Sequence, residues 1–92
     1  ILHANEGADV INAGDGNDFV YAGSGNDVID GGAGTDTLFG ETGDNVIDAG
    51  SGDDIVYTDS GNDNITTGTG HDTVFAGAGD NIITTGADKD TV

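Results

Sequence analysis

The chain has no cysteine, and its 92 residues include only one lysine or arginine, Lys89. The absence of cysteine excludes a disulfide framework and any metal site built from thiolates. The acidic residues number 18 and set the formal net charge at −17, so the chain repels nucleic acids and anionic membrane surfaces. We therefore expect no nucleic-acid partner and no membrane insertion.

Long apolar runs and targeting signals are missing as well. No segment reaches the roughly 20 apolar residues of a membrane-spanning helix, and no signal peptide opens the chain. The first residues, Ile1-Leu2-His3, begin within a repeating pattern, which favours a fragment of a longer protein. We expect residues 1–92 to form a single repeat array, since this length accommodates one small domain. An acidic, glycine-rich chain of this kind is typical of disorder when no counter-charge is present.

A nine-residue repeat runs through the whole sequence without an insertion. Its copies begin at Ala4, Ala13, Ala22, Gly31, Gly40, Ala49, Thr58, Thr67, Ala76 and Thr85. The fourth position is glycine in every copy except the last, where Asp88 stands. The sixth position is Asp or Asn, and the eighth is Ile, Leu or Val throughout.

Each part of the repeat has a physical interpretation. The first six residues are small, glycine-rich and acidic, which predicts a turn with backbone conformations that glycine reaches at low cost. The last three are often β-branched or aromatic, which predicts a short strand with its eighth position pointing inward. One aliphatic side chain in nine residues buries too little apolar surface to offset the entropy of ordering the chain. We therefore expect a cation to hold the acidic turns together.

The segment Gly31-Gly32-Ala33-Gly34-Thr35-Asp36-Thr37-Leu38-Phe39 resembles, at every position, the nonapeptide of the RTX, or haemolysin-type, calcium-binding proteins. The resemblance extends over all 92 residues. It implies an all-β fold, a right-handed parallel β-roll (a β-solenoid) of 18-residue coils with two sheets of short parallel strands and calcium-binding turns on both edges. It also implies calcium held between a turn and the turn 18 residues later, by position-six carboxylates and main-chain carbonyls.

Calcium suits these donors because it takes six or more oxygen atoms from carboxylates and carbonyls in a tolerant geometry, whereas magnesium keeps its own waters. Zinc would require His or Cys, and only His3 and His71 are present. The candidate side-chain ligands are the position-six residues Asp9, Asp18, Asp27, Asp36, Asn45, Asp54, Asp63, Asp72, Asn81 and Asp90. The candidate main-chain carbonyls are those of Gly7, Gly14, Gly16, Gly23, Gly25, Gly32, Gly34, Gly43, Gly50, Gly52, Gly61, Gly68, Gly70, Gly77 and Gly79.

The number of turns predicts the number of ions. Ten turns that alternate between two edges leave four gaps on each edge, which predicts up to about eight calcium ions. Eight divalent ions against a charge of −17 would leave about −1, so the carboxylates are interpreted as ligands. Asn45 and Asn81 offer a carbonyl oxygen without charge, and the last turn has Asp88 in place of glycine. We expect weaker binding at these three places.

Position nine has a second period, of 18 residues. In alternate repeats it reads His3, Tyr21, Phe39, Tyr57 and Phe75, which is called the aromatic row below. If one coil takes 18 residues, the strands that carry these rings lie about 4.7–4.9 Å apart on one outer face. The rings either stack only to stabilise the sheet or, through Tyr21, Phe39, Tyr57 and Phe75, dock another copy or another domain of the parent protein.

An enzyme is not expected, because Ser24, Ser51 and Ser60 lie in turns without a matched His or Lys base. An ice-binding face is not expected either, because position three has no regular row of threonines. Two non-catalytic roles remain. One is a calcium-binding structural segment of a large secreted bacterial surface protein, such as a surface layer, an adhesin or an extracellular filament. The other is a calcium-triggered folding and secretion module attached to an RTX toxin, protease or lipase.

The resemblance implies type I secretion and folding on calcium binding outside the cell, so an extracellular or cell-surface location is expected. The aromatic row and the long array without insertions favour the structural role.

Overall fold

The computed structural model describes all 92 residues. It contains ten β-strands, joined by turns, and no helix. The odd-numbered strands are β1 (Leu2–Glu6), β3 (Phe19–Ser24), β5 (Thr37–Glu41), β7 (Ile55–Ser60) and β9 (Thr73–Ala78). The even-numbered strands are β2 (Val10–Asn12), β4 (Val28–Asp30), β6 (Val46–Asp48), β8 (Asn64–Thr66) and β10 (Ile82–Thr84). The structure has no helix that could span a membrane.

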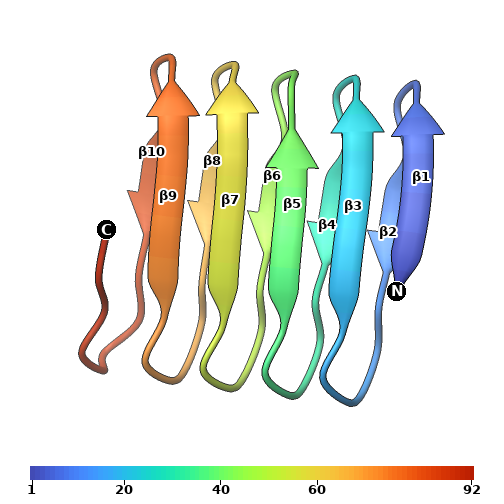
Figure 1. Ribbon diagram of the computed structural model, residues 1–92. Coiled ribbons are helices and arrows are strands. Elements are labelled where there is room, and N and C mark those ends of the chain that lie inside the picture. Colours follow the sequence, from blue (N-terminus) through green and yellow to red (C-terminus); the bar gives the residue numbers. More distant parts are fainter.

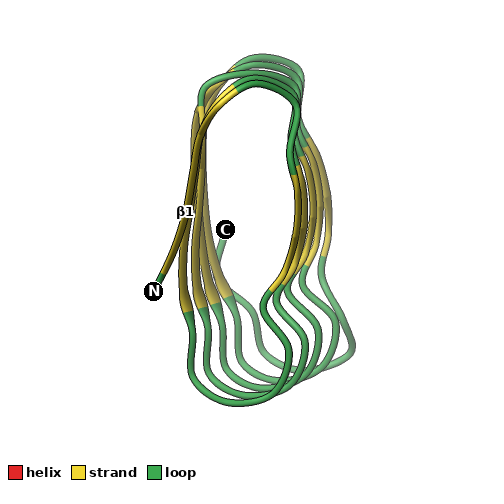
Figure 2. Ribbon diagram, turned by 90° about the vertical axis from the view of Figure 1, so that its right-hand side faces the viewer, coloured by secondary structure: helices red, strands yellow, loops and turns green.

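Odd and even strands form two separate parallel sheets, in the orders β1-β3-β5-β7-β9 and β2-β4-β6-β8-β10. The chain passes from one sheet to the other at every turn, so it winds as a flattened coil with the two sheets facing each other (Figures 1 and 2). Paired strand residues are 18 positions apart, as Leu38 and Val56 are, except at the end of β5, where the register shifts and Glu41 pairs with Thr58. This register confirms the predicted all-β solenoid with 18-residue coils.

The core is a double row of aliphatic side chains between the sheets. The fully buried members at position eight are Val20, Ile29, Leu38, Ile47, Val56, Ile65 and Val74. Ile11 and Ile83 pack against them and are partly buried. These residues confirm that position eight points inward, because neighbouring residues of a strand face opposite sides. Val92 is an exception with 72% of its surface exposed, and it borders a hollow of the last coil.

The two kinds of strand differ in length, which the nine-residue pattern does not predict. Odd strands have five or six residues, and even strands have three. In β7 and β9 the pairing continues past position nine, with Thr58 opposite Ala76 and Ser60 opposite Ala78. The expected six-residue turn is therefore shortened at one edge, because its first three residues extend the sheet.

We name the two edges by the six-residue segments that form them. Edge A follows the odd strands and lies at the top of Figure 1. Edge B follows the even strands and lies at the bottom. Edge A comprises residues 4–9, 22–27, 40–45, 58–63 and 76–81, and edge B comprises 13–18, 31–36, 49–54, 67–72 and 85–90.

Position four requires glycine for two reasons, which Gly34 shows. Its φ is +134°, a conformation that L side chains rarely adopt. A Cβ atom at Gly34 would also collide with the carbonyl oxygen of Gly16 in the preceding turn of the same edge. Close stacking of successive turns therefore depends on a missing side chain at this position, and it brings main-chain carbonyls against the next turn.

Candidate calcium sites

Position-six side chains tie each turn to the turn 18 residues earlier on the same edge. The backbone N–H of Asp18 donates to Oδ1 of Asp36 at 2.8 Å, and that of Asp36 donates to Oδ1 of Asp54 at 2.8 Å. The same bond crosses every gap between turns. The bridging side chains are Asp27, Asn45, Asp63 and Asn81 on edge A and Asp36, Asp54, Asp72 and Asp90 on edge B. The structure thus places the predicted side-chain ligands in two continuous ladders.

The second oxygen of each carboxylate in these ladders has no partner. Oδ2 is buried without a hydrogen bond in Asp9, Asp18, Asp27, Asp36, Asp54, Asp63, Asp72 and Asp90. A buried, unpaired carboxylate oxygen is strongly unfavourable unless a proton or a cation compensates its charge. Eight such oxygens in two regular rows therefore fit divalent cations bound between the turns, and their hard oxygen chemistry fits calcium.

Burial also changes the acidity of this ladder. The pKa of Asp54 is raised to about 6, mainly by burial. The backbone hydrogen bond from Asp36 lowers this pKa, and repulsion from the neighbouring carboxylates of Asp36 and Asp72 raises it. Burial likewise raises the pKa of Asp36. Both residues belong to edge B, where every position-six residue is an aspartate. The stacked carboxylates of this edge repel one another and are shielded from solvent, so a bound cation would stabilise them strongly.

Backbone carbonyls must complete each site, because nowhere do three or more His, Cys, Asp or Glu side chains converge in a metal-binding group. The position-four carbonyls of Gly16, Gly34 and Gly52 accept no backbone hydrogen bond. The position-two carbonyls of Gly14 and Gly32 already accept bonds from Ala33 and Ser51, which leaves one lone pair on each. The geometry therefore favours position-four carbonyls among the candidate glycines.

Two threonines carry further buried oxygens without partners, which the sequence analysis did not identify as candidate ligands. Thr58 and Thr67 hold position one of their turns and are 5% and 0% exposed. Their Oγ1 atoms are buried without a hydrogen-bond partner. The signal in the sequence is a polar residue at a position that is otherwise Ala or Gly, apart from Thr85.

Asp88 stands in the last turn, where we expected weaker binding. It is exposed, and its Oδ2 accepts a bond from the N–H of Gly70 at 3.2 Å. In this position Asp88 provides an acceptor where the other turns have a stacking glycine.

The aromatic row forms as the 18-residue period predicts. Successive ring centroids from His3 through Tyr21, Phe39 and Tyr57 to Phe75 lie 4.8, 4.7, 4.9 and 4.9 Å apart, with the ring planes within 8° of parallel. The spacing is that of neighbouring strands, so the sheet sets the stack. Each inner ring has both faces covered by its neighbours, which leaves ring edges as the exposed part of the row.

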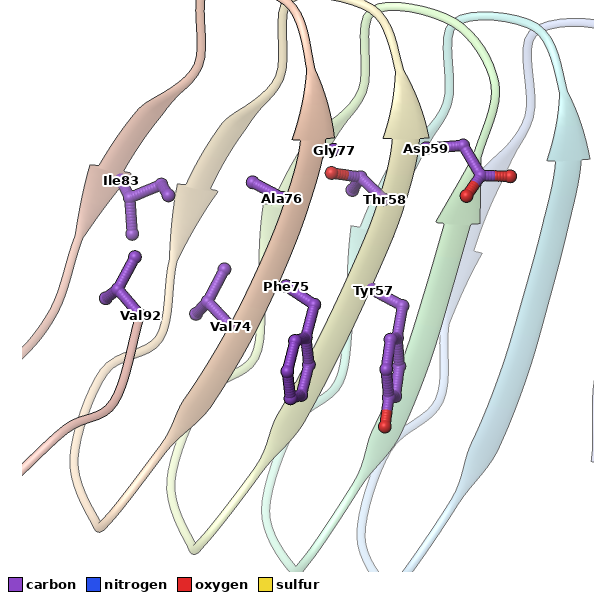
Figure 3. A pocket seen from close by; sticks show the side chains of 9 residues that line it. All are labelled: Tyr57, Thr58, Asp59, Val74, Phe75, Ala76, Gly77, Ile83 and Val92. Carbon is purple, nitrogen blue, oxygen red and sulfur yellow. The ribbon is translucent and has the colours of Figure 1, made fainter.

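The main hollow of the surface lies at the last coil, apart from the carboxylate ladders. Figure 3 shows the side chains around it, among them Tyr57, Phe75, Ile83 and Val92. Asp59 and Thr58 are the polar side chains that border it. An apolar hollow with one carboxylate lacks the paired acid and base or the nucleophile and base of a catalytic site.

Comparison with known proteins agrees with this geometry. The family described as the RTX calcium-binding nonapeptide repeat (4 copies) matches residues 1–29, 30–65 and 57–92, which together cover the whole chain. No curated protein and no solved structure matches the chain significantly. The repeat, the 18-residue register and the ladders of buried carboxylates agree with that match, and the chain belongs to the RTX calcium-binding nonapeptide repeat family.

Proposed function

We propose that the chain is a calcium-dependent structural segment of a secreted surface protein, one that stays unfolded until it meets calcium outside the cell. The observation that carries the proposal is the row of buried carboxylate oxygens without partners. With a formal charge of −17, the turns stack only when their carboxylates are neutralised. Because the ligands are brought together by folding itself, the free energy of calcium binding is free energy of folding.

Location follows from the same linkage. Any species that binds only the folded state stabilises it in proportion to the logarithm of its concentration. A calcium-poor cytoplasm therefore leaves the chain unfolded and suited to export, whereas millimolar calcium outside the cell folds it. We propose an extracellular or cell-surface location on this ground.

The structural role is supported by the regularity of the stack. Both ladders run without an insertion, and the aromatic row adds a second set of contacts between the same coils. Such a stack is quasi-one-dimensional, with each coil stabilised by its neighbours, and suits a rigid spacer or filament. Contacts with other copies or domains through the aromatic row remain a prediction.

The proposal is tested by circular dichroism of the 92-residue chain in EGTA and in millimolar calcium. We expect a disordered spectrum under chelation and a β-rich spectrum with calcium, reversible on chelation. Magnesium at the same concentration serves as the control and should not fold the chain. A spectrum that is unchanged between EGTA and calcium would contradict the proposal.

A further inference from the structure

The two edges carry different position-six ladders. Edge B presents an aspartate at every turn, whereas edge A alternates after its first turn. The bridging residues of edge A are in order Asp27, Asn45, Asp63 and Asn81. All four accept a hydrogen bond from a backbone N–H of the preceding turn. The two asparagines therefore remove negative charge from the ladder and keep its hydrogen bonds.

Asn45 satisfies all of its polar atoms within the protein. It is 1% exposed, and its Oδ1 accepts a bond from the N–H of Asp27 at 2.9 Å, as an aspartate would. Its Nδ2 donates to the carbonyl oxygen of Gly40 in its own turn at 3.1 Å. Asn45 accordingly has no unpaired buried atom, in contrast to the aspartates of both ladders.

The amide nitrogen of Asn45 occupies the place that the unpaired oxygen takes in an aspartate turn. A Cβ atom at Gly31 would lie 3.0 Å from Oδ2 of Asp36, and a Cβ atom at Gly40 would lie 3.1 Å from Nδ2 of Asn45. Both glycines hold position one of their turns, so the two side-chain atoms are equivalent. Nδ2 of Asn45 is a donor that already has an acceptor, whereas Oδ2 of Asp36 is an acceptor that has no donor.

Asn81, two turns later on edge A, is partly buried and makes a similar pair of bonds, with a position-two carbonyl in place of the position-one carbonyl as its acceptor. Its Oδ1 accepts from the N–H of Asp63 at 2.8 Å, and its Nδ2 donates to the carbonyl oxygen of Gly77 at 3.2 Å. A carbonyl that accepts this N–H is turned towards a donor, and a cation at the same place would meet the positive end of the amide dipole. The same replacement at two alternate turns makes it a regular property of edge A.

We propose that Asn45 and Asn81 close their turns with an amide N–H in place of calcium, so that calcium bridges six gaps of the roll and not eight. This inference rests on the assignment of position-six carboxylates as calcium ligands. The bridged gaps are those of Asp27, Asp36, Asp54, Asp63, Asp72 and Asp90. Edge B is the continuous calcium ladder, and edge A alternates calcium with hydrogen-bonded turns.

The carboxylates next to these asparagines do not restore the missing ligands. Asp44 and Asp80 stand at position five and are exposed. Oδ1 of Asp44 accepts from the N–H of Asn62 at 2.8 Å, in an outer ladder along the surface of the edge. Their charge lies outside the stacked turns, so six ions would leave the roll with a net charge of about −5 from its formal −17.

The ion count in calcium-saturated protein tests the inference, measured by native mass spectrometry and by isothermal titration calorimetry with calcium alone. We expect six ions in the wild type and a gain of two in the Asn45→Asp/Asn81→Asp double variant, because each new carboxylate lacks the donor. Asn26→Asp/Asn62→Asp is the matched control, since these exposed residues of edge A add the same two charges in the outer ladder. It should leave the count unchanged.

A reciprocal variant protects the test against a failure to fold. Asp63→Asn keeps the Oδ1 acceptor for the N–H of Asn45 and adds an N–H donor, so it should fold in calcium and bind one ion fewer. Eight ions in the wild type, or no gain in the double variant, would overturn the inference. A wild type that binds no calcium would instead overturn the calcium sites themselves, together with this inference.

Discussion

The backbone N–H of Asp36 donates to Oδ1 of Asp54 at 2.8 Å, while Oδ2 of Asp54 is buried without a partner. One oxygen of the carboxylate thus joins two coils, and the other is the candidate calcium ligand. Folding and metal binding therefore depend on the same side chain. The turns form the ladder only when they stack, and they stack without severe repulsion only when the ladder is neutralised.

Replacement of Asp36 by alanine removes both functions of the carboxylate. We expect the loss of one bound calcium ion and a destabilisation of about 1–3 kcal/mol from the unpaired N–H of Asp18 alone. The control is Asp53→Ala, which removes the same charge from an exposed position-five residue. Calorimetry should show fewer ions only for Asp36→Ala, and equal losses in both variants would contradict the ligand assignment.

Asn45→Ala should behave differently from Asp36→Ala. The substitution removes the acceptor for the N–H of Asp27 and the donor to Gly40, so the calcium-bound fold should lose stability. Because the amide carries no charge, the number of bound ions should remain that of the wild type. Thermal unfolding in saturating calcium and calorimetry of the same sample separate the two effects.

Acid should weaken calcium binding through edge B. The pKa of Asp54 is raised by burial to about 6, above its usual 3.8, so the folded chain binds a proton at this carboxyl more tightly than the unfolded chain. Without calcium, this group favours the fold below about pH 4, and that contribution is lost as the pH rises through about 6. Calcium must displace the proton below pH 6, so the calcium midpoint of folding should rise between pH 7 and pH 5. Asp54→Asn should reduce the pH dependence, and a midpoint independent of pH would contradict the buried ladder.

The aromatic row should stabilise the roll by stacking. Tyr57 lies 4.9 Å from both Phe39 and Phe75, and aromatic pairs contribute about 0.5–1.5 kcal/mol each beyond their buried area. Tyr57→Ala should therefore lose on the order of 1–3 kcal/mol of stacking in calcium. Phe19→Ala is the control, because Phe19 is 47% exposed and belongs to no ring stack. Equal destabilisation by both substitutions, measured by chemical unfolding, would show that stacking contributes nothing beyond burial.

The sequence predicted most of the fold because one physical rule governs each repeat position. An aliphatic residue at position eight must point inward. Because side chains alternate between the two faces of a strand, this requirement fixes which residues of neighbouring strands pair, and Leu38 lies opposite Val56 as the 18-residue period predicts. The extended odd strands were missed, since residues such as Ala76 and Gly77 are typical of turns and their pairing depends on neighbouring coils. The sequence identified which residues form the ladders. It gave no indication of which oxygen of Asp54 bridges the coils, because that choice follows from the path of the stacked backbone.

Thr67 offers a test of the ligands that the repeat pattern missed. Its hydroxyl is buried without a partner in the turn that carries Asp72. Thr67→Val preserves the shape of the side chain and removes the hydroxyl, so we expect a weaker calcium affinity for one site. If calorimetry gives Thr67→Val the same calcium affinity as the wild type, a ligand role for this hydroxyl would be contradicted.

Self-association through the aromatic row depends on ring edges, because the faces of the inner rings are already covered by their neighbours. If the row docks another copy, dynamic light scattering should show calcium-dependent assembly that weakens when Tyr21, Phe39, Tyr57 and Phe75 are all replaced by serine. The loss of stacking also destabilises the roll, so circular dichroism must first confirm that the variant is folded in excess calcium. Val10, Val28 and Val46 provide the matched control, since these exposed side chains lie on the outer face of the other sheet. Their replacement by serine should leave assembly unchanged. A wild type that stays monomeric in calcium at high concentration would limit the row to its stabilising role, which its covered ring faces already explain.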